Sequence, residues 1–209
     1  MMTNDHLQSV HDDIAYMRAM AQEGRNAPLL NGPILVAAAI IFGVASLGQW
    51  AIQTGIVDVS PWAQLWLWVA AAVIFAVALT LLIRRQATRP GARSAANKAV
   101  GAAWTAVGFG IFATWLTFMA VGFTSGDWAV MRLMPSVVAV AYGSAWVVAG
   151  AMACRKWLSA VGVASYAGAV LLGVVAGGPA VYLVYAGLLV VAALLPGLAL
   201  MRQEPSEVI

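Results

Sequence analysis

The chain has 209 residues, of which 63% are hydrophobic and 9% are charged, and its formal net charge is +3. Soluble globular proteins carry about 25% charged residues, because their surfaces must present polar groups to water. The composition therefore excludes an ordinary soluble protein and predicts an integral membrane protein, whose outer surface contacts lipid. Since Cys154 is the only cysteine, an intramolecular disulfide framework and a multi-thiolate metal site built by this chain alone are also excluded.

The first 28 residues form a separate amino-terminal segment. Within residues 6–25, apolar side chains recur every three or four positions, a spacing that predicts an amphipathic helix. The segment is net acidic, whereas helices that lie on anionic membranes usually present lysine and arginine. We therefore expect residues 6–25 to dock on another membrane or cytoplasmic protein, or on the chain's own basic loop. The candidate docking face consists of Leu7, Val10, Ile14 and Met17.

Six apolar runs follow, each close to the roughly 20 residues that an α-helix needs to cross a bilayer. Turn-forming sequences separate these runs. The sequence thus predicts an all-α membrane protein with an amino-terminal segment at 1–28, a six-helix transmembrane domain at 29–201 and a tail at 202–209. The transmembrane helices are expected near residues 34–52, 62–83, 99–123, 133–153, 157–176 and 179–200.

The cations are distributed unevenly between the loops. Two precede the first predicted helix, five lie between the second and third, two between the fourth and fifth, and one follows the sixth. Only Arg132 lies in a loop on the opposite side. Because cytoplasmic loops carry an excess of lysine and arginine, we expect both termini in the cytoplasm and the chain in a bacterial plasma (inner) membrane. The basic stretch from Arg84 to Lys98 is then a cytoplasmic loop that faces anionic headgroups, and no nucleic-acid partner is expected.

Small residues at spacings of four recur in three of the predicted helices. Because small residues let transmembrane helices approach closely, we expect the third, fourth and fifth helices to pack tightly. Pro196 lies inside the sixth predicted helix and should kink it or end it. The three series are Ala102, Ala106, Gly110 and Thr114; Ala141, Ala145, Ala149 and Ala153; and Ser165, Ala169, Gly173 and Gly177.

No Asp, Glu, Lys, Arg or His lies in the interior of a predicted transmembrane helix. Such residues mark proton relays, ion paths and catalytic pairs in membranes. No serine has a nearby histidine or lysine in the sequence that would activate it. We therefore expect no enzyme, no catalytic residue and no cofactor. His6, His11 and Asp12 lie close together, but their spacing does not imply the geometry of a metal site, so no metal is expected.

The polar side chains that remain inside the helices leave two functional classes open. We favour a non-enzymatic regulatory or accessory membrane partner that acts through its amino-terminal helix. The alternative is a channel or carrier for a small neutral solute or lipid, because hydroxyl groups can replace part of a solute's hydration shell. The same hydroxyls can instead bond to carbonyl groups of their own helices. The candidate path residues are Thr114, Thr117, Tyr142, Ser144, Tyr166 and Tyr185.

A faint internal similarity supports the alternative. The segment GAAWTAVG at residues 101–108 resembles GSAWVVAG at residues 143–150, and the two predicted helices run in opposite directions. Inverted repeats of this kind occur in transporters.

Overall fold

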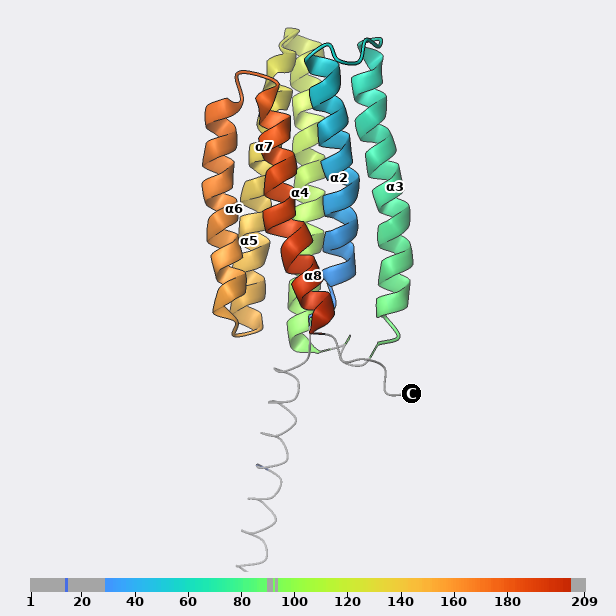
Figure 1. Cartoon of the computed structure of the whole chain (residues 1–209). Coiled ribbons are helices and arrows are strands. Elements are labelled where there is room, and N and C mark those ends of the chain that lie inside the picture. Colours follow the sequence, from blue (N-terminus) through green and yellow to red (C-terminus); the bar gives the residue numbers. More distant parts are fainter. Residues whose placement is uncertain (1–13, 15–28, 90–91, 93, 204–209) are drawn as a thin grey trace, which may run out of the picture.

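The computed structural model describes residues 14, 29–89, 92 and 94–203, and the regular structure in this part of the chain is entirely helical (Figure 1). Six helical segments are long and apolar enough to cross a membrane, which confirms the six predicted for the described residues. In chain order the elements are α2 (Gly32–Gln53), α3 (Trp62–Gln86), α4 (Ala95–Ser125), the 3₁₀-helix η1 (Trp128–Leu133), α5 (Met134–Met152), α6 (Lys156–Val175), α7 (Ala180–Leu189), the π-helical turn η2 (Val190–Leu194) and α8 (Leu195–Arg202).

Two of the six apolar segments are composite. The 3₁₀-helix η1 runs directly into α5, so the fourth segment begins at Trp128, earlier than the predicted residue 133. The sixth segment consists of α7, η2 and α8 in succession and continues to Arg202. Pro196 therefore does not end this helix, and the interruption takes the form of a π turn directly before the proline.

The helices alternate in direction, so their connections gather at two ends of the bundle (Figure 1). The entry into α2 and the end of α8 lie at one end, together with the α3–α4 and α5–α6 connections. Most described cations lie at this end, which we call the basic end. The opposite end carries Arg132, Asp58 and Asp127. The cations of the basic end are Arg84, Arg85, Arg89, Lys98, Arg155, Lys156 and Arg202.

Contacts between the helices are unequal. Helix α2 packs against α3, α7, η2 and α8, and the most extensive contact in the described chain joins α5 to α6. Helix α4 packs on α5 and η1, whereas α3 packs on α2 and makes no comparable contact with another described helix. Helices α3 and α4 therefore form two edges of the bundle.

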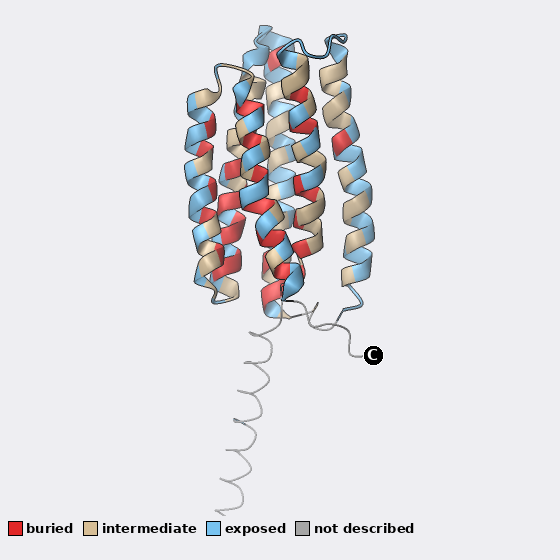
Figure 2. Ribbon diagram, in the orientation of Figure 1, coloured by how far each residue is buried: buried red, intermediate tan, exposed pale blue. Residues whose placement is uncertain are grey.

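Burial follows the same division (Figure 2). Buried side chains lie along α2, α5, α6 and α7, and Trp146, Leu158, Leu172 and Val181 are among the least exposed. In α3, every residue of which is described, Ala71 is the only buried side chain. The exposed surface of the helices is rich in valine, leucine, isoleucine and phenylalanine, as expected for a surface that contacts lipid.

Helices α5 and α6 approach each other through glycines. A Cβ atom built at Gly162 would lie 2.9 Å from the carbonyl oxygen of Gly143, and one built at Gly150 would collide with Ser159. The two backbones are therefore in direct contact, which gives extensive van der Waals packing in a bilayer.

The small-residue series are only partly packing surfaces. In α5, Ala145 and Ala149 are buried, and in α6 Ser165 and Ala169 are buried, as expected. In α4, however, Ala102, Ala106 and Gly110 are exposed, so the prediction of a packing face there was wrong. The reason is that α4 lies at an edge and contacts the core with a different set of side chains, including Val100, Trp104, Val107 and Ile111.

Candidate functional site

The chain enters the bundle at the basic end through a buried anchor. Leu29 and Leu30 are each only 5% exposed, and the backbone N–H of Leu30 donates a hydrogen bond of 3.2 Å to Oδ1 of Asn97 in α4. Ser94 caps the first turn of α4, and its hydroxyl oxygen accepts from the backbone N–H and from Nδ2 of Asn97, both at 3.2 Å. We call Leu29, Leu30, Ser94 and Asn97 the amino-terminal root. The first described residues after the amino-terminal segment are therefore fixed to α4.

Helix α8 touches the chain directly after this root. A Cβ atom at Gly32 would lie 2.8 Å from the carbonyl oxygen of Gly197, and one at Gly197 would lie 3.0 Å from the carbonyl oxygen of Gly32. The backbones of α2 and α8 are thus in contact at the first turn of α2. At the same end, the guanidinium of Arg155 donates a hydrogen bond to the side-chain oxygen of Gln203, which joins the α5–α6 turn to the end of α8.

The predicted docking face lies mostly outside the described residues. Of its four members, Ile14 is described, and it is helical and 37% exposed. Leu7, Val10 and Met17 lie outside the described part of the chain. The amphipathic helix and its docking role stay predictions.

The candidate path residues fall into three groups. Tyr142 and Tyr185 are buried in the hydrophobic core. The hydroxyls of Thr114 and Thr117 donate to the carbonyl oxygens of Gly110 and Ala113 in their own helix, at 2.8 and 2.9 Å. The third group is the exposed pair of Ser144 and Tyr166, whose hydroxyl oxygens lie 3.0 Å apart.

An open groove lies between α4 and α5 and has a volume of about 310 Å³. Its lining is formed by small and apolar side chains together with the hydroxyl of Ser144. The Ser144–Tyr166 pair therefore places a polar group beside this apolar groove. The lining residues are Ala103, Ala106, Val107, Gly110, Ala141, Ser144, Ala145 and Val148.

The two similar sequence segments lie on the helices that form this groove. Trp104 and Trp146 occupy corresponding positions in residues 101–108 and 143–150, and their rings meet edge to face with centroids 5.5 Å apart. Trp104 makes a second edge-to-face contact with Tyr142 at 5.0 Å. The two similar segments therefore lie on adjacent antiparallel helices, and their tryptophans belong to one aromatic cluster.

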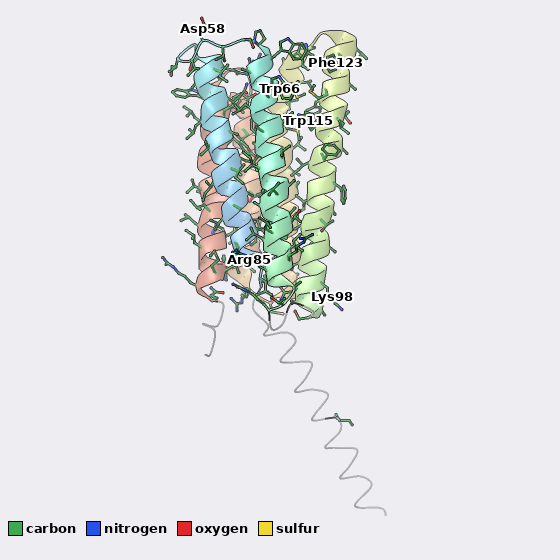
Figure 3. The ribbon with its side chains drawn as sticks, turned by 90° about the vertical axis from the view of Figure 1, so that its right-hand side faces the viewer. Asp58, Trp66, Arg85, Lys98, Trp115 and Phe123 are labelled. Atoms are coloured by element: carbon green, nitrogen blue, oxygen red, sulfur yellow. The ribbon has the colours of Figure 1, made fainter. Side chains whose placement is uncertain are left out.

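A polar contact that the sequence did not specify attaches α3 to α2. Gln49 is buried, and its Nε2 donates to Oε1 of Gln64 at 2.6 Å, while Nε1 of Trp68 donates to Oε1 of Gln49 at 3.2 Å. We call Gln49, Gln64 and Trp68 the glutamine clasp. It lies toward the end opposite the basic end, where α3 begins; Figure 3 labels Trp66 in this region. These hydrogen bonds attach the beginning of α3 to α2, whereas the rest of α3 buries only Ala71.

A second unforeseen contact lies in the centre of the bundle. Nε1 of Trp146 in α5 donates a hydrogen bond of 2.8 Å to the carbonyl oxygen of Ala192 in the π turn η2. Both residues are buried. Because proline has no N–H, Pro196 leaves the carbonyl of Ala192, four residues earlier, without its helical donor. The sequence does not indicate which side chain donates to this carbonyl instead.

Within the described residues, no group of three or more His, Cys, Asp or Glu side chains is placed to hold a metal ion. Comparison of the chain with protein-family models, curated protein sequences and solved structures finds no match.

Proposed function

We propose that the chain is a non-enzymatic regulatory or accessory subunit of a membrane complex, which acts through residues 6–25 on a membrane or cytoplasmic protein. The observation that carries the proposal is the amino-terminal root. Leu29 and Leu30 are buried, and the N–H of Leu30 is bonded to Asn97 of α4. The acidic segment with its apolar stripe is thus joined in sequence to an anchored position, which restricts where it can meet a partner.

The location of the root supports a cytoplasmic partner surface. The root lies at the basic end, beside the α3–α4 and α5–α6 connections and the end of α8. Loops rich in lysine and arginine are retained on the cytoplasmic side of bacterial inner membranes, so we assign this end and both termini to the cytoplasm. The cations there also attract anionic headgroups, which holds the root at the membrane surface.

The chemistry of the bundle favours a binding role over catalysis. The helix interiors carry apolar, small and hydroxyl side chains, and several of the polar side chains inside them are bonded to one another or to backbone carbonyls, as in the glutamine clasp. Asp, Glu, Lys, Arg and His, which supply most catalytic and proton-transfer chemistry in bilayers, do not occur in the interiors of the predicted transmembrane helices.

The test compares the intact chain with a version lacking Met1 to Arg25, each cross-linked in its native membrane, purified, and analysed by mass spectrometry. We expect a stoichiometric partner with the intact chain and its loss with the deletion. Two point variants sharpen the test: Ile14→Asp places a charge on the predicted docking face, and Ala19→Asp places the same charge on the opposite face of that helix. Partner capture should fall with Ile14→Asp and persist with Ala19→Asp. The proposal fails if no version holds a partner, or if the deleted version holds the same one.

A carrier for a small neutral solute or lipid is the second candidate, and the groove between α4 and α5 is what favours it. Ser144 lines the groove and its hydroxyl lies 3.0 Å from that of Tyr166, so a ligand's polar group would find two hydroxyls beside an apolar surface. A carrier should keep its flux in liposomes when the residues before Asn26 are removed, and should lose flux with Ser144→Ala. Flux that depends on Ser144 and not on the amino-terminal segment would replace the first proposal with this one.

A further inference from the structure

The regular hydrogen bonding of the last transmembrane segment is interrupted at Pro196. In an α-helix the N–H of each residue donates to the carbonyl four positions earlier, and proline has no N–H. The carbonyl left without this donor is that of Ala192. Directly before the proline, residues 190–194 form a π turn, in which the N–H of Leu195 bonds to the carbonyl oxygen of Val190, five residues earlier. Such turns interrupt the regular hydrogen bonding of a helix and are frequent at functional sites.

The freed carbonyl is satisfied from another helix. Nε1 of Trp146 donates to the oxygen of Ala192 at 2.8 Å, and the Trp146 side chain is only 1% exposed. Inside a bilayer no water is available to replace this donor, so an unbonded carbonyl there is strongly disfavoured. The indole of α5 therefore stabilises the shape that the sixth segment adopts at this point.

The helices on the two sides of this interruption, α7 and α8, pack against different neighbours. On one side, α7 packs against α2, α5 and α6, and Val181 and Leu189 are buried in the core. On the other side, α8 packs against α2, through the backbone contact of Gly197 with Gly32, and Gln203 accepts a hydrogen bond from Arg155. A change of angle at residues 190–196 would thus leave α7 in place and move α8 relative to the start of α2.

We infer that residues 190–196 are a hinge in the last transmembrane segment, locked by the hydrogen bond from Trp146 to Ala192, and that α8 is its moving arm. Because Gly197 touches Gly32, two residues after Leu30, the arm links this lock to the amino-terminal root. The hinge requires no partner, so its test is independent of the proposed regulatory function. If both are correct, engagement of the amino-terminal segment and the angle of α8 are coupled.

The hinge is measured directly by the distance between two spin labels within the sixth segment, in the full chain reconstituted in lipid nanodiscs. Labels at Leu183 and Met201, both exposed, lie on either side of residues 190–196. A control pair at Ala160 and Val174 lies on the uninterrupted helix α6. The exposed Cys154 is first replaced by serine so that it takes no label.

Trp146→Phe removes the indole donor and keeps an aromatic ring. We expect the 183–201 distance distribution to shift or broaden, and the 160–174 distribution to stay unchanged. Trp104→Phe is the matched control, because it alters the same aromatic cluster and leaves the bond to Ala192 in place. The inference is overturned if Trp146→Phe leaves the 183–201 distribution unchanged, or if Trp104→Phe changes it equally.

Pro196→Ala provides the decisive second variant. Alanine restores an N–H at residue 196, which can bond to the carbonyl of Ala192 and make the indole donor redundant. Pro196→Ala alone should narrow the 183–201 distribution, and Trp146→Phe should have little effect in that background. If Trp146→Phe does not fold by itself, Pro196→Ala alone still decides, since an unchanged distribution would show that the proline creates no hinge.

Discussion

Helices α6 and α3 are both transmembrane in length and composition, yet they are attached to the bundle in different ways. Helix α6 lies with its backbone against that of α5, where Gly162 faces the carbonyl oxygen of Gly143. Helix α3 buries one side chain, Ala71, and α2 is the one described helix on which it packs extensively. Its most specific contact is the glutamine clasp of Gln49, Gln64 and Trp68.

The difference shows two solutions to helix association without a hydrophobic driving force between helices. In lipid, association depends on van der Waals packing and on interhelical hydrogen bonds, because lipid tails are as apolar as the side chains. The α5–α6 pair relies on the first, and α3 on the second, with help from Phe42 and Phe75, whose rings lie 5.2 Å apart. Substitutions that enlarge a side chain in the α5–α6 contact should therefore destabilise the packing of α6. Substitutions that remove polar groups should destabilise the packing of α3.

The largest effect is expected from Gly162→Ala in α6. The new Cβ would lie 2.9 Å from the carbonyl oxygen of Gly143, a backbone atom that cannot turn aside. We expect a loss of about 2–3 kcal/mol in the free energy of unfolding, the upper part of the range of about 1–3 kcal/mol for overpacked cores. Reversible unfolding in mixed micelles followed by circular dichroism measures it.

Gly173→Ala is the matched control in the same helix. A Cβ there would meet nothing within 4 Å, and alanine is the better helix former, so the free energy of unfolding should be unchanged or raised by up to about 1 kcal/mol. Equal losses at both glycines would contradict the claim that close backbone contact stabilises the α5–α6 pair.

Gln49→Leu should break the glutamine clasp. It removes the donor to Gln64 and the acceptor of Trp68, and we expect a loss of about 1–2 kcal/mol, since interhelical hydrogen bonds in membranes contribute modestly. Thr80→Val in α3 is the control, because the hydroxyl of Thr80 donates to the carbonyl of Ala76 in its own helix. An equal effect of the two substitutions would show that the clasp has no special role.

A smaller effect is expected from Gly143→Ala. Its Cβ would lie 2.7 Å from ring atoms of Tyr166, but this side chain is partly exposed and can rotate outward. The expected loss is about 1 kcal/mol. Combining the substitution with Tyr166→Ala should cost less than the sum of the two single changes, as measured by a double-mutant cycle. Strict additivity would show that the ring is not what limits the approach at Gly143.

The sequence was sufficient for the parts of the fold that depend on hydrophobic length. Six apolar runs of bilayer-spanning length predicted six helices, and the described cations other than Arg132 lie at the end where the α3–α4 and α5–α6 connections are. The sequence was insufficient to predict how each helix is rotated about its axis, and so which face it turns toward its neighbours. The four-residue spacing of Ala102, Ala106 and Gly110 identifies one face of α4, but not whether a neighbour covers that face, and the structure leaves it exposed.

The polar contacts between helices escaped prediction for the same reason. Gln49 and Gln53 lie one turn apart and both donate to Gln64, so their spacing was a usable signal that α2 has a polar stripe. The partner in α3 depends on how the two helices are rotated. The bond from Trp146 to Ala192 spans 46 residues and joins a side chain to a backbone carbonyl, for which sequence has no signature.

The end of α3 lies close in sequence to the amino-terminal root, on which the proposed function depends. Helix α3 ends at Gln86, a few residues before Ser94 of the amino-terminal root. The root is held by Asn97 of α4, whereas α3, at another edge of the bundle, is attached to α2 by the glutamine clasp. A movement of α3 would therefore also move the α3–α4 connection, which lies beside the root.

If the glutamine clasp fastens α3 to α2, the distance from α3 to α6 should depend on the clasp. In the full chain with Cys154→Ser, spin labels at the exposed Val77 of α3 and Val170 of α6 report that distance, and labels at Ile40 of α2 and Val170 serve as the reference. We predict that Gln49→Leu broadens the 77–170 distribution and leaves the 40–170 distribution unchanged. An unchanged 77–170 distribution, or equal broadening of both, would show that the clasp does not hold α3 in place.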